Sequence, residues 1–321
     1  VCVSSLQSKE AMIRKKLCYL LLTAAFLTAC GGPRSGGAAA PPSDDAKPAY
    51  FLPMLPPADL DAAGQQAYLR EHYWDRLDFA DTLFLRRADS LQMLDAFVGY
   101  LRIIGPMDGE AMRGLMARAA QSKPMLTYFY TMAEKVLNDP NSPFRSDELL
   151  IPVLETVIAS PSFDEYEKMA PAYDLQLASQ NRIGRPANDF RFTLASGARQ
   201  SLYGIKAEYT LLFLHNPGCP MCREIMQELT ASPMLTEMIE RRALRVLALY
   251  PDEDLGEWRR HFDEIPASWI NAYDAGCTIE KGRLYSLRAI PALYLLDSRK
   301  QVLLKDVTEV AQVEELIDRR G

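Results

Sequence analysis

The stretch that decides the fold is YTLLFLHNPGCPMC, residues 209–222. Its first half, residues 209–215, is nearly all apolar, which is typical of a strand covered on both faces. A helical pattern of apolar residues follows over 223–229. The two cysteines of this stretch, Cys219 and Cys222, therefore lie where a buried strand passes into a helix.

That position gives the cysteine pair a chemical meaning. Pro220 suits the first position of the helix, because the N–H that proline lacks would have no intrahelical partner there. Cys219 is then the N-cap residue, and the N–H groups of Met221 and Cys222 should point toward its sulfur. The helix dipole also favours negative charge at this end, so the sequence predicts a Cys219 thiolate that attacks other sulfurs.

Cys222 should be shielded from solvent. It shares a helix face with three apolar residues, namely Ile225, Met226 and Leu229. We therefore expect an exposed attacking thiol, Cys219, and a buried resolving thiol, Cys222, one turn later.

Strand and helix patterns alternate around this stretch, as expected for an α/β domain. The other expected strands cover four ranges: 190–194, 244–249, 292–296 and 302–304. The last two form a hairpin, and further helices are expected at 257–262 and 308–319. Residues 181–188 indicate a joint, so this domain is predicted to span 181–321.

Several motifs of this domain together resemble the thioredoxin fold of TlpA/ResA-type proteins, which reduce or exchange disulfides outside the cytoplasm. They lie at 184–190, 201–203, 211–214, 219–222 and 289–297. The resemblance implies that Pro291 is the family's cis-proline, and that Pro291, Ile290 and Pro220 line the groove for a substrate chain. The layout of the whole chain is similar to a Bacteroidetes-type group of lipoproteins that carry a helical domain before such a module.

The chain departs from the family pattern at three places near the cysteines. Gly218 stands where the family usually has Trp, and Phe213 stands where thioredoxin has a buried Asp. Ile225 occupies the place of a frequent Glu, while Glu224 lies one residue early and should face the other way. The resemblance therefore supplies no acidic proton carrier for the Cys222 thiol. His215 has two interpretations, either a proton shuttle or a partly buried polar residue near the site.

Residues 59–180 predict an all-α domain, because apolar residues recur there at spacings of three and four. Breaks are expected at Gly105-Pro106, at 139–143 and at Ser160-Pro161, and Pro152 should kink the helix that starts near residue 147. His72 lies in an aromatic helical stripe and is interpreted as a packed or surface residue. This domain contains no repeat, metal-ligand spacing or catalytic group of residues that declares a function, and its partner is unknown.

The N-terminal residues predict a signal peptide and a lipid anchor. Arg14, Lys15 and Lys16 precede an apolar run over 17–29, which is too short to cross a bilayer and is typical of a signal peptide. Residues 27–30 resemble a bacterial lipobox, which implies cleavage after residue 29 and lipid attachment to Cys30. Met12 could be the initiator. Residues 30–58 are rich in Gly and Pro and are expected to be a flexible tether.

Composition narrows the class of protein further. The chain has 321 residues, 48% of them hydrophobic and 24% charged, with a net charge of −6. These proportions are typical of a globular protein of about two domains and argue against a collagen-like, disordered or multi-span membrane protein. The acidic balance also argues against nucleic-acid binding, which needs clustered Lys and Arg.

Two other uses of the cysteine pair, a zinc site and a peroxiredoxin site, fit the sequence poorly. A zinc site needs two more ligands, and the candidates Cys277, His215 and His261 show no second paired spacing. A peroxiredoxin would want Thr or Ser where Asn216 stands. Cys277 lies in a turn-like segment and is interpreted as a buried or idle thiol. A permanent structural disulfide in a binding scaffold remains an open alternative.

We therefore expect a lipid-anchored protein of the cell envelope that exchanges disulfides with other envelope proteins through Cys219 and Cys222. No nucleotide or metal cofactor is expected. The alternative is a lipid-anchored protein-binding scaffold with a thioredoxin fold and a structural or vestigial cysteine pair. The direction of electron flow is left open.

Overall fold

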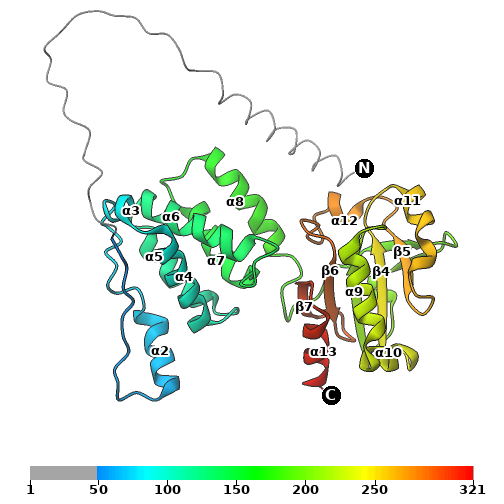
Figure 1. Ribbon diagram of the computed structural model, residues 1–321. Helices are drawn as coiled ribbons and strands as arrows, with labels where there is room; N and C mark the ends of the chain where they lie inside the picture. Colours follow the sequence, from blue (N-terminus) through cyan, green and yellow to red (C-terminus); the bar gives the residue numbers. More distant parts are fainter. Residues whose placement is uncertain (1–48, 321) are drawn as a thin grey trace, which may run out of the picture.

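The computed structural model describes residues 49–320 and shows a helical region followed by a mixed α/β region (Figure 1). This is the expected fold class. The helical region contains α2 (Ala62–His72), α3 (Phe84–Arg87), α4 (Ser90–Ile104), α5 (Gly109–Ala119), α6 (Lys123–Ala133), α7 (Asp147–Ala159) and α8 (Glu165–Ala178). A π-helical turn, Glu134–Asn138, extends α6. Within residues 49–320, no helix is long and apolar enough to span a membrane.

The helical region buries one continuous apolar core, to which α4, α5 and α6 each contribute one buried apolar face. Side chains at the helix starts satisfy free N–H groups: Asp89 accepts from Leu91 and Gln92, and Asp164 and Glu167 form a capping box. These local signals explain why the helices begin where they do.

The tether was expected to extend to residue 58, but the structure packs residues near its end. Phe51 is buried and stacks on Trp74 with ring centroids 4.7 Å apart. The backbone of Phe51 also exchanges hydrogen bonds with the Gln92 side chain. Composition predicts a flexible segment here, but burial of the aromatic side chain of Phe51 orders the end of this Pro-rich segment.

Helix α7 runs as one element through Pro152, the residue at which a kink is expected. Pro152 lies in the second turn and removes the backbone bond to Glu148. Apolar packing offsets this loss, because most of the helix, Pro152 included, is buried.

The α/β region is built on a seven-stranded sheet with the order β2-β1-β5-β4-β3-β6-β7. Its strands are β1 (Arg191–Leu194), β2 (Arg199–Ser201), β3 (Tyr209–Leu214), β4 (Leu244–Tyr250), β5 (Ile270–Tyr273), β6 (Ala292–Leu296) and β7 (Val302–Val307). Strands β3, β4 and β5 are parallel, while the other neighbouring pairs are antiparallel. The expected hairpin is therefore present as β6 and β7.

Apolar side chains cover both faces of the sheet. Phe213 and alternate residues of β3 pack against α9 (Pro220–Ala231), α10 (Pro233–Glu240) and α13 (Val310–Asp318). Leu212 and the opposite residues pack with Phe190, Tyr285 and α12 (Thr278–Lys281). The remaining helix, α11 (Leu255–Arg260), follows β4. This double covering explains why β3 is buried at every position.

Charged side chains join the two regions across the edge strand β7. Asp306 forms an ion pair with Arg145, and Lys305 forms one with Asp147 at 2.6 Å. The Lys305 ammonium also donates to the backbone oxygens of Ala178 and Gln180 at 2.8 and 2.5 Å. The side chains of this cluster are mostly buried, so the cluster holds the helical region in a defined position beside the sheet.

Candidate active site

The two cysteines of the candidate site lie where β3 passes into α9. Cys219 is the N-cap residue of α9, Pro220 occupies the first helical position, and the Cys222 N–H donates to the Cys219 sulfur at 3.3 Å. The expected second bond, from Met221, is not among the cap contacts of this helix. The N-cap placement of Cys219 is therefore confirmed, with one N–H donor at its sulfur instead of two.

Exposure separates the two thiols in the predicted order. Cys219 is partly exposed, whereas Cys222 is 5% exposed and lies in the core with Ile225 and Leu229. Burial, followed by the neighbouring Cys219 sulfur, raises the pKa of the Cys222 thiol well above its ordinary value. No disulfide joins them, so the structure shows the dithiol form. One thiol is accessible for attack, and the other is held back until a partner sulfur approaches it.

Gly218 has a conformational reason to replace the larger family residue. Its φ is +70°, in the left-handed region that other residues rarely adopt. A side chain there would also meet the His261 ring, which lies 3.6 Å from the position of an added Cβ. The loop before Cys219 is thus shaped for glycine.

The peptide bond between Ile290 and Pro291 is cis, as the resemblance implied. Pro291 is buried just before β6, and Ile290 packs against the same apolar cluster as Cys219. Ile290, Pro291 and Met221 line one cleft. Pro220 is exposed at the start of α9 and is not among the residues that line this cleft.

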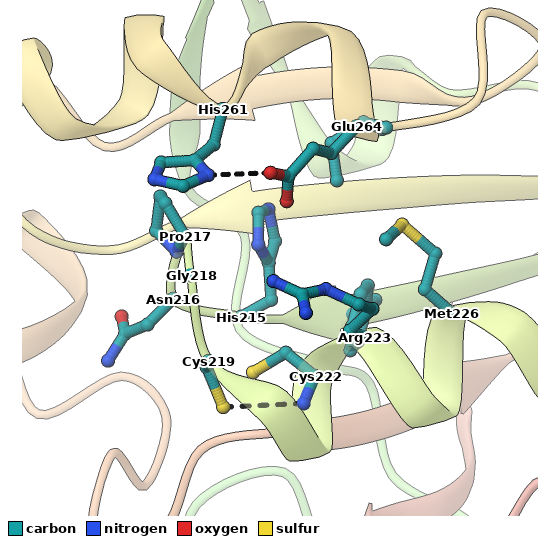
Figure 2. A pocket seen from close by; sticks show the side chains of 12 residues that line it. His215, Asn216, Pro217, Gly218, Cys219, Cys222, Arg223, Met226, His261 and Glu264 are labelled. Atoms are coloured by element: carbon teal, nitrogen blue, oxygen red, sulfur yellow. Dashed lines mark hydrogen bonds and ion pairs between the residues drawn. The ribbon is translucent and has the colours of Figure 1, made fainter.

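A second, much smaller cavity lies behind the cysteines (Figure 2). Its volume is about 20 Å³, which is enough for one water molecule. His215 Nε2 and Asn216 Oδ1 are buried in this region with no hydrogen-bond partner among the described residues. Both residues line the cavity together with Cys219 and Cys222, so two polar atoms that need partners lie beside the dithiol.

His215 is more buried than expected. It is 4% exposed and stacks on Phe213 with ring centroids 5.2 Å apart. Burial lowers the pKa of His215 to about 4, although the nearby Glu264 opposes this shift. The imidazole is therefore neutral near pH 7, when it has a nitrogen free to accept a proton.

The positions of the missing family acids are filled by apolar side chains. Phe213 and Ile225 are both buried, and Glu224 is exposed on the other side of α9, as expected. No carboxylate therefore takes their place beside Cys222 on these elements. The imidazole of His215 and the amide of Asn216 are the uncharged polar groups of the small cavity.

The sequence offers His261 only as a candidate metal ligand, whereas the structure places it in the lining of the small cavity beside the cysteines. His261 bonds to Glu264 at 2.7 Å (Figure 2) and to Glu257 at 3.0 Å. Both carboxylates raise the pKa of His261, and Glu264 has the larger effect. The i,i+3 and i,i+4 spacing of these residues was the available sequence signal. Within residues 49–320, no cluster of three His, Cys, Asp or Glu side chains could hold a metal ion.

The remaining candidates lie elsewhere. Cys277 is 1% exposed at the start of α12 and does not line the small cavity. His72 bonds to Asp75 on the surface of the helical region, in agreement with its interpretation as a surface residue. Cys30, the expected lipid attachment residue, lies outside the described residues.

Comparison with known proteins places the chain among thioredoxin-like proteins. A thioredoxin-like protein from Bacteroides caccae is 43% identical, with 84% of this chain and 98% of that chain covered and a TM-score of 0.78. The C-terminal domain of an uncharacterized protein from Bacteroides fragilis is 46% identical over 43% of this chain and 98% of that domain, with a TM-score of 0.42.

Two further comparisons concern the rest of the chain and more distant structures. Residues 28–181 match a domain of unknown function, DUF5106. A domain of a possible thiol-disulfide isomerase from Cytophaga hutchinsonii is 21% identical over 44% of this chain and 95% of that domain, with a TM-score of 0.38. A search of the curated proteins finds no match.

Proposed function

Because the chain belongs to the family of thioredoxin-like proteins, we propose that it is a thiol-disulfide oxidoreductase that acts on protein disulfides. The observation that carries this proposal is the arrangement of the cysteine pair. A partly exposed Cys219 caps α9, and a buried Cys222 lies one turn later with its N–H on the Cys219 sulfur. A dithiol at a helix N-terminus is the arrangement that thiol–disulfide exchange requires.

The proposed reaction passes two electrons from the dithiol to the substrate. The Cys219 thiolate attacks one sulfur of a substrate disulfide, so that bond breaks and a Cys219–substrate disulfide forms while the other substrate sulfur leaves as a thiolate. The Cys222 thiol then loses its proton and attacks the Cys219 sulfur. This step releases the second substrate thiol and leaves a Cys219–Cys222 disulfide. The reverse sequence oxidises a substrate dithiol.

His215 has a defined place in this proposal. The Cys222 thiol must lose a proton to resolve the intermediate, and burial raises its pKa. The small cavity joins Cys222 to the neutral His215 imidazole, and its volume allows one water between them. We place His215 there as a neutral hydrogen-bond acceptor that orients the Cys222 thiol through this water, since its lowered pKa makes it a weak base.

The finer assignment extends to the subtype and the location. We propose a TlpA/ResA-type protein that is anchored through a lipid on Cys30 and faces the cell envelope. The support is the basic, apolar and lipobox-like pattern of residues 12–30, which lies outside the described residues. Several acyl chains on one residue give stable anchoring, so no membrane-spanning helix is needed.

Trapping of the intermediate tests the proposed activity. In a Cys222→Ser variant, Cys219 can attack but cannot be released, so mixed disulfides with envelope proteins should accumulate. They should appear as high-mass bands that collapse on reduction. Cys219→Ser should form few such adducts, since the remaining thiol of the pair is buried.

The alternative is a binding scaffold, and it is favoured by the buried apolar residues Phe213 and Ile225, which stand where relatives carry an acid. A scaffold predicts that partner binding survives in the double variant Cys219→Ser/Cys222→Ser, without covalent adducts from either single variant. If Cys222→Ser traps nothing while the double variant still binds its partners, the scaffold replaces the enzyme.

A further inference from the structure

A cleft of about 690 Å³ lies between the helical region and the α/β region. One wall comes from two loops of the helical region, around Met107 and Asn141. The other wall comes from the start of α9, the cis-proline loop and the end of β7. Figure 1 shows β7 and α13 on the side of the sheet that faces the helices. The helical region therefore forms one side of a space whose other side belongs to the redox domain.

The start of the helix that carries the dithiol borders this cleft, although the two cysteines themselves line the small cavity. Met221, which stands between the two cysteines, lines the cleft, and so do Ile290 and Pro291. Cys219 packs in the same apolar cluster as Ile290. A polypeptide whose disulfide reaches Cys219 would consequently place its neighbouring residues in the cleft, against the wall from the helical region.

Three large apolar side chains are exposed around the cleft, one from each part of its lining. Met107 of the helical region is 53% exposed, Ile183 of the joint 41%, and Met221 of the redox domain 57%. Exposed apolar side chains gathered around one depression indicate a binding surface rather than scattered surface residues. Methionine also adapts its shape to different partners.

The charges on the cleft floor are already paired. Arg145 pairs with Asp306, and Lys305 pairs with Asp147, each across the boundary between the two regions. These pairs fix the two walls relative to each other, so the cleft is formed before a substrate arrives. Because each of these charges has a partner, the floor does not require a charged substrate.

We propose that this cleft is a substrate-binding groove for an extended polypeptide segment that carries an apolar side chain next to its disulfide-bonded cysteine, and that the helical region supplies the second wall. The inference rests on the proposed oxidoreductase function and names its substrate class. The volume of about 690 Å³ lies in the range of clefts that enclose most of the surface of a bound ligand. Met221 lies two residues after Cys219, so a substrate side chain held in the cleft would help to orient the disulfide for attack.

A single-turnover reaction of the reduced full-length protein tests the proposal. The substrates are two short synthetic peptides whose central cysteine carries a thionitrobenzoate group, one flanked by leucines and the other by serines. Attack by Cys219 breaks that disulfide and releases coloured thionitrobenzoate, and Cys222 then releases the peptide thiol. The protein should react about tenfold faster with the leucine peptide than with the serine peptide, as expected for apolar contacts in a pocket.

Met107→Lys should reduce this preference about fivefold, because an ammonium group must be desolvated where the leucine packs. The matched control is Met169→Lys, since Met169 is 66% exposed on α8 and does not line the cleft. It should keep the preference of the parent protein. Ile183→Lys, on the joint, should act like Met107→Lys and serves if that variant does not fold.

Dithiobis(nitrobenzoate), a small disulfide with no peptide, tests the oxidoreductase function separately from the proposed groove. All four proteins should react with it at similar rates, and Cys219→Ser should not release its coloured group through the site. If the parent protein fails this reaction, the oxidoreductase function is wrong. If it passes but shows no leucine preference, or if Met107→Lys and Ile183→Lys keep that preference, the proposed groove is overturned and the oxidoreductase function stands.

Discussion

The environment of single side chains decides what the candidate site can do. The Cys222 thiol is buried, and the His215 imidazole beside it has a nitrogen with no partner among the described residues. Sequence reasoning found both cysteines from their position between a strand and a helix. It could not settle His215, because burial and an unpartnered nitrogen depend on Phe213, Glu264 and the loop around them.

His215 should make the protein sensitive to acid. Its folded pKa of about 4 lies below the unfolded value, so the unfolded chain binds an extra proton between about pH 6.5 and 4. The stability that the neutral buried ring contributes is complete above about pH 6.5 and is lost as the pH falls toward 4. This loss amounts to something on the order of 3 kcal/mol.

A His215→Phe variant should keep the stacking on Phe213 and lose less stability between pH 6.5 and 4, as measured by urea unfolding at several pH values. His261→Gln is a control of opposite sign. Carboxylates raise the pKa of His261, so that residue stabilises the fold at low pH, and its loss should not flatten the profile. An unchanged profile in His215→Phe would contradict the account of the buried ring.

At the scale of elements, helix α9 depends on its N-cap. The Cys219 sulfur accepts the Cys222 N–H, one of the donors that a helix start leaves without an intrahelical partner. The same residue serves folding and chemistry, because the sulfur that caps the helix is also the proposed attacking group.

Two substitutions at Cys219 should separate these roles. Serine is a strong N-cap residue, so Cys219→Ser should unfold at a urea midpoint close to that of the reduced parent protein. Cys219→Ala leaves the N–H without an acceptor and should be less stable than Cys219→Ser by about 1 kcal/mol. Equal stability of the two variants would show that the cap does not hold α9.

The elements that sequence predicted best were those with a strong local pattern. The apolar runs of β3 and β4 and the hairpin of β6 and β7 were placed correctly. Strand β5 was not predicted, since Asn271 interrupts its apolar pattern and only Ala272 of its four residues is buried. Phe51 in the expected tether was misjudged, because its packing against distant residues overrides the local preference of a Pro-rich segment.

At the scale of the whole molecule, the relation between the two regions decides the substrate cleft. Arg145 and Asp306 are separated by 161 residues in the sequence and meet across the boundary. Asp306 also has a φ of +54° and lies where the pairing of β6 with β7 shifts its register, so the backbone is irregular at this residue. No local pattern announces such a contact, so the sequence predicted two domains but not the groove between them.

The buried pair should matter far more than an exposed ion pair. Burial raises the pKa of the Asp306 carboxyl, and Arg145 opposes that shift. Arg145→Leu leaves a buried carboxyl without its partner and should lower the free energy of unfolding by about 3–5 kcal/mol. Arg113 is the control, because it pairs with Glu155 on the surface of the helical region, with side chains 47% and 41% exposed.

Arg113→Leu should cost no more than about 1 kcal/mol, because exposed ion pairs contribute little. Both variants can be compared by urea unfolding at neutral pH and moderate salt. Similar effects for the two would contradict the claim that the buried pair fixes the walls of the cleft.

The central claim is that Cys219 and Cys222 form a dithiol that cycles during function. Its most direct test is the reduction potential of this pair, measured by equilibration of the full-length protein with thiol–disulfide buffers and quantification of the free thiols by alkylation and mass spectrometry. Exchange catalysts lie between about −270 and −120 mV, whereas permanent structural disulfides lie below about −300 mV. The account predicts a reversible transition of the Cys219–Cys222 pair within the first range. A pair that stays oxidised below about −300 mV, or that never forms a disulfide, would contradict it.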